Sequence, residues 1–64
     1  MTRTYDKEIA NVKKGEIITC IEKDGFDDYK PYELKLRVDR VNKNTVSVTC
    51  VSGYMKNSAW KIRK

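Results

Sequence analysis

The amino-acid sequence predicts an all-β fold, a small five-stranded barrel that a short N-terminal helix would precede. Apolar and polar residues alternate over several short segments, which is typical of strands that bury one face. Turn-forming residues separate these segments. Only 64 residues are present, and four or five strands in so short a chain favour closure, because a closed barrel has no exposed sheet edge.

The first part of the chain is ambiguous between an extension and a helix. We expect a single domain over residues 1–64, in which residues 1–12 form an N-terminal extension or short helix and residues 13–64 form the barrel. Tyr5, Ile9 and Val12 have the spacing of one apolar stripe on a helix. Two turns alone are marginal in water, however. Gly15 then predicts a turn, because glycine readily adopts a positive φ.

A first strand is predicted from Glu16 to about Ile21, where β-branched residues are frequent. Apolar side chains such as Ile17 and Ile18 fall on both faces, which indicates a central strand covered on both sides. The next dozen residues, 22–33, mix acids, turn formers, aromatic residues and the only proline. They predict a long irregular loop.

Residues 34–51 predict a β-hairpin. Leu34, Leu36 and Val38 should point inward, and the alternation then breaks at Arg40, so that Val41 rather than Arg40 would face the core. A bulge or bend there would restore the register. The tight turn is placed at residues 42–44, since asparagine tolerates left-handed backbone conformations. The return strand, 45–51, should bury Val46, Val48 and Cys50.

The C-terminal part predicts a short strand at residues 54–56, a single helical turn at 57–59, and a last strand at 60–63. In the last strand Trp60 and Ile62 would point inward.

Metal binding and catalysis are not expected. The two cysteines, Cys20 and Cys50, form no CxxC pair and the chain has no histidine, so a tetrahedral metal site would lack ligands. Both are expected to be free buried thiols, with a disulfide as the alternative if their strands are neighbours. Without histidine or a glycine-rich phosphate loop, no enzymatic activity and no cofactor are predicted. The absence of a long apolar run predicts a cytoplasmic protein without membrane contact.

Charge divides the chain in two. Residues 1–33 hold six lysines and arginines against eight acids, whereas residues 34–64 hold eight against Asp39 alone. Several of these cations fall on outward strand positions, so we expect a basic surface that binds a phosphate backbone. The candidate nucleic-acid-binding residues are Lys35, Arg37, Arg40, Lys43, Tyr54, Lys56, Lys61 and Arg63.

The acidic loop favours a different partner. Its acids and aromatic rings would repel phosphate and could instead dock on a larger protein. The candidate protein-binding residues are Asp24, Phe26, Asp27, Asp28, Tyr29 and Tyr32. The sequence therefore leaves two partner classes open, DNA or RNA bound without sequence preference, or a larger protein, and it does not specify an oligomeric state.

Three segments, Val12–Ile17, Val38–Val41 and Val46–Val48, stand in an order that resembles the small SH3-like barrels, in particular the KOW and Tudor-like modules of transcription and translation proteins. The likeness covers about residues 12–64. The final glycine of a full KOW signature and a Tudor-type aromatic cage are missing. The resemblance implies a binding module without a particular ligand. The small, lysine-rich chain also resembles accessory proteins of phages.

Overall fold

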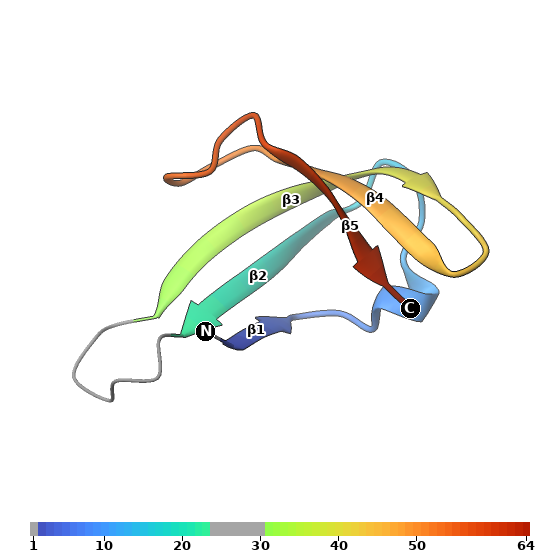
Figure 1. Ribbon diagram of the computed structural model, residues 1–64, viewed down its shortest axis with the longest axis horizontal. Helices are drawn as coiled ribbons and strands as arrows, with labels where there is room; N and C mark the ends of the chain where they lie inside the picture. The colour runs from blue at the N-terminus through green and yellow to red at the C-terminus, as the bar shows by residue number, and fades with distance from the viewer. Residues whose placement is uncertain (1, 24–30) are drawn as a thin grey trace.

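The computed structural model describes residues 2–23 and 31–64, which form one antiparallel sheet (Figure 1). Neighbours in the sheet are also neighbours in sequence, in the order β1-β2-β3-β4-β5. The strands are β1 (Thr2–Tyr5), β2 (Ile17–Lys23), β3 (Tyr32–Val41), β4 (Thr45–Cys50) and β5 (Ala59–Arg63), and a 3-10 helix, η1, spans Ile9–Asn11. The predicted all-β fold with five strands is confirmed. No helix in the described ranges is long and apolar enough to cross a membrane.

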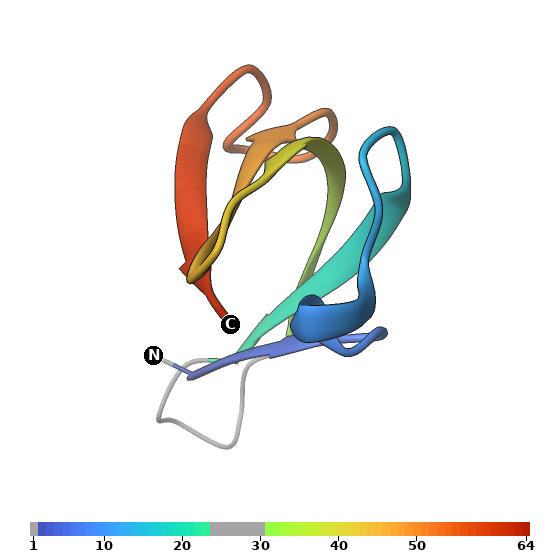
Figure 2. The ribbon, with the colours of Figure 1, turned by 90° about the vertical axis from the view of Figure 1, so that its right-hand side faces the viewer.

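The sheet curls into a half-barrel that its hydrogen bonds do not close (Figure 2). Within the described ranges β1 pairs only with β2 and β5 only with β4, so the complete closure expected from the sequence is not reached. Side chains span the gap instead, because the guanidinium carbon of Arg3 on β1 lies 5.4 Å from the centre of the Trp60 ring on β5.

The N-terminal segment forms a strand followed by a single 3-10 turn, so the helix considered for Tyr5 to Val12 is wrong. The edge of β2 offers ladder hydrogen bonds that a two-turn helix in water cannot match. Tyr5 lies opposite Cys20, and Asp6 continues the ladder through its amide and carboxylate, both bonded to Thr19. Burial of the apolar stripe was nevertheless predicted correctly, since its three side chains all pack in or against the core.

The inner face of the half-barrel forms the core. Its buried apolar residues are Val12, Ile18, Cys20, Leu34, Leu36, Val38, Val46, Val48, Cys50 and Ile62. Inward positions predicted on β3, β4 and β5 are thereby confirmed, with Trp60 partly buried against them. Both cysteines are free and buried. Their strands flank β3 and are not neighbours, so the condition set for a disulfide is not met.

One expectation for β2 fails. Its outward residues Ile17 and Ile21 are 46% and 38% exposed, so the strand is central in the sheet but covered on one face only. The loop predicted at residues 22–33 was too long at both ends, because β2 continues to Lys23 and β3 begins at Tyr32.

The bulge predicted in the third strand is present. Val38 lies opposite Val48, but Arg40 lies opposite Ser47, which leaves Asp39 as the extra residue. Val41 shares the inner side with its partner Val46, as predicted. It remains 39% exposed, because the strand there runs past the end of the core.

Two turns complete the sheet. The hairpin turn at residues 42–44 is confirmed, and the Asn42 amide donates to the Thr45 carbonyl over 2.8 Å. Residues 54–57 form turns, so the strand predicted at 54–56 and the helical turn at 57–59 are wrong. Among described non-glycine residues the left-handed conformation occurs at Asn57, with φ 74°. Gly53 is required here, since its φ is +81° and a Cβ would lie 2.5 Å from Leu34 Cδ2.

Candidate nucleic-acid interface

The first two cations of β3 are already paired. Lys35 lies on the outer face opposite Thr19, where its Nζ donates to Thr19 Oγ1 over 2.7 Å and lies 3.2 Å from a carboxylate oxygen of Glu33. Arg37 Nε lies 2.9 Å from Oδ1 of Asp39. Although both side chains are about half exposed, their charges are offset locally. These two residues are therefore weaker phosphate ligands than their outward positions indicated.

Cations near the other end of β3 are unpaired. Arg40 on β3 and Lys61 on β5 both lie opposite Ser47 on β4, so the three form one row across the outer face. Arg63 lies two residues further along β5, opposite Thr45. None of these cations forms an ion pair with a carboxylate in the described ranges. The alternation predicted outward positions for Lys61 and Arg63, whereas the row that joins Arg40 to Lys61 through Ser47 was not predicted.

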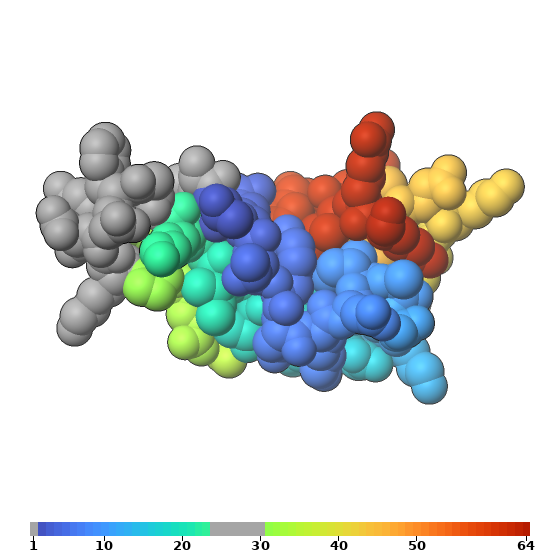
Figure 3. Space-filling view, turned by 90° about the horizontal axis from the view of Figure 1, so that it is seen from below, coloured from blue at the N-terminus to red at the C-terminus, as the bar shows by residue number. Residues whose placement is uncertain are grey.

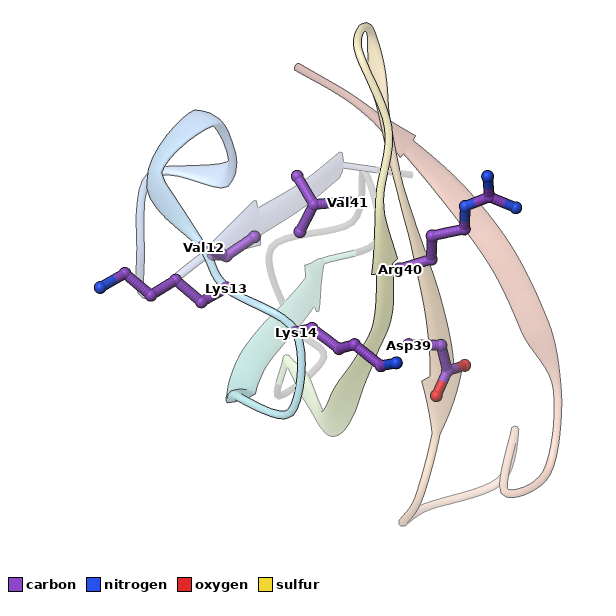
Figure 4. Close-up of a pocket in the computed structure, with 6 residues that line it drawn as sticks. All are labelled: Val12, Lys13, Lys14, Asp39, Arg40 and Val41. Carbon is purple, nitrogen blue, oxygen red and sulfur yellow. The ribbon is translucent and has the colours of Figure 1, made fainter.

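An open groove of about 580 Å³ adjoins this row (Figure 4). The residues around it are Val12, Lys13, Lys14, Asp39, Arg40 and Val41. The connection before β2 lies against β3 because the Gly15 amide donates to the Val38 carbonyl over 2.8 Å and the Val38 amide to Glu16 over 2.9 Å. Gly15 has the positive φ expected of it, +90°. Val41 projects from β3 toward that connection, whereas Lys13 extends away from the groove (Figure 4).

Lys13 and Lys14 were missed as site residues. In the sequence they belong to a turn before Gly15. Because they lie far from the basic C-terminal half along the chain, they were not grouped with its cations. Packing of the turn against the end of β3 brings them beside Arg40. The adjacency of two lysines is a charge signal that a turn assignment concealed. We call the seven cations at this end of the molecule the basic end: Lys13, Lys14, Arg40, Lys43, Lys61, Arg63 and Lys64, whose amide bonds to the Asn44 carbonyl.

Asp39 is the single acid at the junction of two hollows. It lines the groove just described and a smaller hollow of about 270 Å³ that reaches Ser47, Ala59 and Lys61. A hydrogen bond from the Thr49 hydroxyl, and then one from Arg37, lower the pKa of Asp39 below its ordinary value of 3.8. The carboxylate is therefore charged at neutral pH, and both bonds hold it toward Thr49 and Arg37.

The opposite end of the sheet is aromatic and acidic. Glu22 is fully buried, and its carboxylate accepts hydrogen bonds from Arg3 Nε over 2.9 Å and from the Tyr54 hydroxyl. Tyr32 and Tyr54 form an edge-to-face pair with ring centres 5.5 Å apart. The bond to Glu22 raises the pKa of the Tyr54 phenol above 10.0. We call Arg3, Glu22, Tyr32 and Tyr54 the tyrosine end.

The predicted nucleic-acid residues therefore fall into two groups. Arg40, Lys61 and Arg63 lie at the basic end, and Lys43 is in the hairpin turn beside them. Tyr54 lies instead at the tyrosine end. Lys56 is in the turn that follows it, with its amide bonded to Gly53. The structure does not bring these last two beside the basic end.

Most of the predicted protein-binding residues, namely Asp24, Phe26, Asp27, Asp28 and Tyr29, lie outside the described residues. Tyr32, the remaining one, is 50% exposed at the start of β3. Across residues 2–23 and 31–64 no cluster of three or more acids, cysteines or histidines has the geometry to hold a metal ion. The lack of a cofactor and of catalysis stay predictions.

Comparisons with known proteins identify no relative. Neither protein-family models, nor curated proteins, nor solved structures give a match to this chain. The resemblance to SH3-like barrels stays a prediction, and the function has to be argued from the geometry of the site.

Proposed function

We propose that this protein binds nucleic acid through its basic end, by contacts to phosphates and without strong sequence preference. The observation that supports this is the row of Arg40 and Lys61 beside Lys14, all lacking a carboxylate partner among the described residues. Unpaired cations release condensed counterions when they meet phosphates, which is the main source of non-specific affinity.

Between the cations, the outer face at this end carries the short side chains of Ser47 and Thr45. Both hydroxyl oxygens already accept hydrogen bonds from the Asn42 side-chain amide. Phosphate contacts position a protein on nucleic acid but carry no sequence information. The expected mode is therefore electrostatic and strongly dependent on salt.

Fluorescence anisotropy with labelled DNA and RNA over a salt series tests the proposal. If about four cations contact phosphates, log affinity for a duplex should fall with log salt with a slope of roughly −3.6. The double variant Arg40→Gln, Lys61→Gln should weaken binding by about tenfold or more and reduce the slope by roughly two.

The matched control is Lys35→Gln with Lys56→Gln, which removes the same charge away from the basic end. We expect less than a twofold effect from it. Equal losses in both double variants would mean that net charge alone drives binding. No binding at low salt would refute the proposed function.

A larger protein is the alternative partner, and one observation favours it. Tyr32 and Tyr54 are 50% and 63% exposed as an edge-to-face pair, and exposed tyrosines are frequent at protein interfaces. A partner of this kind should be lost from a pull-down with Tyr32→Ser and retained with Arg40→Gln, Lys61→Gln. The reverse pattern would exclude the tyrosine end as its docking surface.

A further inference from the structure

The basic end and the exposed tyrosines lie at opposite ends of β3. Tyr32 is the first residue of that strand, whereas Arg40 and Val41 are the last two of its ten residues. At about 3.3 Å per residue the separation is roughly 30 Å, most of the 37 Å length of the molecule. Figure 1 shows β3 running along this long axis. Tyr54 stays with Tyr32, 5.5 Å away.

The remaining described aromatic rings are engaged on the inner side. Tyr5, which lies opposite Cys20, packs against the core. Trp60, which lies opposite Val48, also packs against the core. Arg3 covers the Trp60 ring. Among the described residues, therefore, no exposed ring accompanies the cations of the basic end, and a base bound there would have no platform on which to stack.

The cations are spread over two strands that flank a third. Arg40 and Lys61 lie on the strands on either side of Ser47, so their Cα atoms are about 10 Å apart. Because each charge stands at the end of a long flexible side chain, the two groups can reach phosphates on the two sides of a groove about 6 or 12 Å wide. Lys13 and Lys14 line the open groove together with Arg40, and on the face shown in Figure 3 the segment around η1 (blue) lies next to the C-terminal strand (red).

These observations bear on the form of nucleic acid that the basic end would hold. Single strands bind non-specific proteins largely through bases stacked on aromatic side chains. Duplexes have a higher charge density and release more counterions per contact, so cations without aromatic rings favour them. We propose that the basic end binds double-stranded nucleic acid, contacting the phosphate backbones on the two sides of one groove, in preference to single strands. This inference rests on the proposed function.

The test compares a mixed-sequence duplex with its separate strands, by anisotropy at about 50 mM salt. About 12 base pairs suffice, because they span roughly 41 Å at 3.4 Å per pair, longer than the 37 Å molecule. Duplex DNA, duplex RNA and each single strand form separate arms. The expected affinity for at least one duplex is about tenfold above that for the strands, with log–log salt slopes near −3.6 and −2.8.

Two further readouts separate stacking from phosphate contact. Tyr54→Ala should leave duplex affinity unchanged within about twofold, and the fluorescence of Trp60, the only tryptophan, should not be quenched on binding. A single strand bound within threefold of the best duplex, or weakened severalfold by Tyr54→Ala, would overturn the inference but leave the proposed function intact. Absence of binding to every arm at low salt would refute both.

Discussion

The two ends of the sheet treat charge in opposite ways. At the tyrosine end the carboxylate of Glu22 is fully buried and accepts hydrogen bonds from Arg3 and Tyr54, so the polar groups there are paired with one another. At the basic end the cations of Arg40 and Lys61 project to solvent without partners in the described ranges. Internal pairing fixes structure, whereas unpaired charge is available to a ligand. Substitutions at the first end should therefore change stability, and those at the second should change affinity.

The largest effect is expected from Glu22→Ala. It removes the acceptor that holds the Arg3 guanidinium and the Tyr54 hydroxyl, and it leaves a cavity at the edge of the core. Loss of a buried hydrogen-bonded charge should lower the free energy of unfolding by about 2–3 kcal/mol, less than for a fully buried pair because Arg3 is partly exposed.

Thermal unfolding followed by circular dichroism would measure this as a fall in midpoint of more than about 10 °C. Glu33→Ala is the control, since the Glu33 side chain is 62% exposed and should change stability by less than about 0.5 kcal/mol. Similar midpoints for both variants would show that the Glu22 network does not hold the half-barrel together.

Lys13→Gln with Lys14→Gln tests the residues that sequence inspection missed. Both side chains are exposed, so the unfolding midpoint should change little. Loss of two cations beside the groove should weaken duplex binding by about tenfold. Lys7→Gln with Lys23→Gln removes equal charge elsewhere and serves as the control. Unchanged affinity would confine the interface to the strands.

The fold was predictable where local patterning determines it. The alternation in residues 34–39 and 45–50 marks most of β3 and all of β4. The phase break at Arg40 and Val41 predicted a bulge, whose extra residue is Asp39, just before that break. The spacing of Tyr5, Ile9 and Val12 led to the wrong prediction of a helix, because three apolar residues at this spacing also fit a strand followed by a turn. Only the unpaired edge of β2 decides between them, and this is a tertiary property.

The positive charge of the candidate site was predictable from the sequence, but the set of residues that form it was not. The outward positions of Lys61 and Arg63 follow from alternation, and that of Arg40 follows from the break in it. Lys35 and Arg37 pair with Glu33 and Asp39, which lie two residues away on the same strand, so this pairing is a local feature that the alternation already contains. Recruitment of Lys14 depends instead on the packing of a turn against β3, which the strand pattern does not specify.

Asp39→Asn should strengthen nucleic-acid binding by about threefold, a smaller effect of opposite sign. The change removes the acid between the two hollows and releases Arg37 from its ion pair. Because the pKa of Asp39 is lowered in the folded protein, its contribution to stability is present above pH 3.8 and is lost as the pH falls through the folded value.

The same variant should consequently show a weaker decline in unfolding midpoint below about pH 4 than the parent protein. Asp6→Asn is the control for affinity, because Asp6 follows β1 and its carboxylate accepts the Thr19 amide of β2 rather than lying beside the basic end. A fall in affinity with Asp39→Asn would indicate that the carboxylate positions Arg37 for binding instead of repelling phosphate.

Tyr54→Phe should have the smallest effect, a modest fall in unfolding midpoint at neutral pH that disappears at alkaline pH. The hydrogen bond to Glu22 raises the pKa of the Tyr54 phenol in the folded protein, so the stability it contributes is present below pH 10.0 and is lost as the pH rises through the folded value. The parent protein should therefore lose more of its unfolding midpoint above pH 10 than the variant does. The two proteins differ in this hydroxyl alone, so the difference between the two curves reports on the Tyr54 phenol. Nucleic-acid affinity at neutral pH should be identical in the two proteins, and a loss in the variant would place the tyrosine end within the interface.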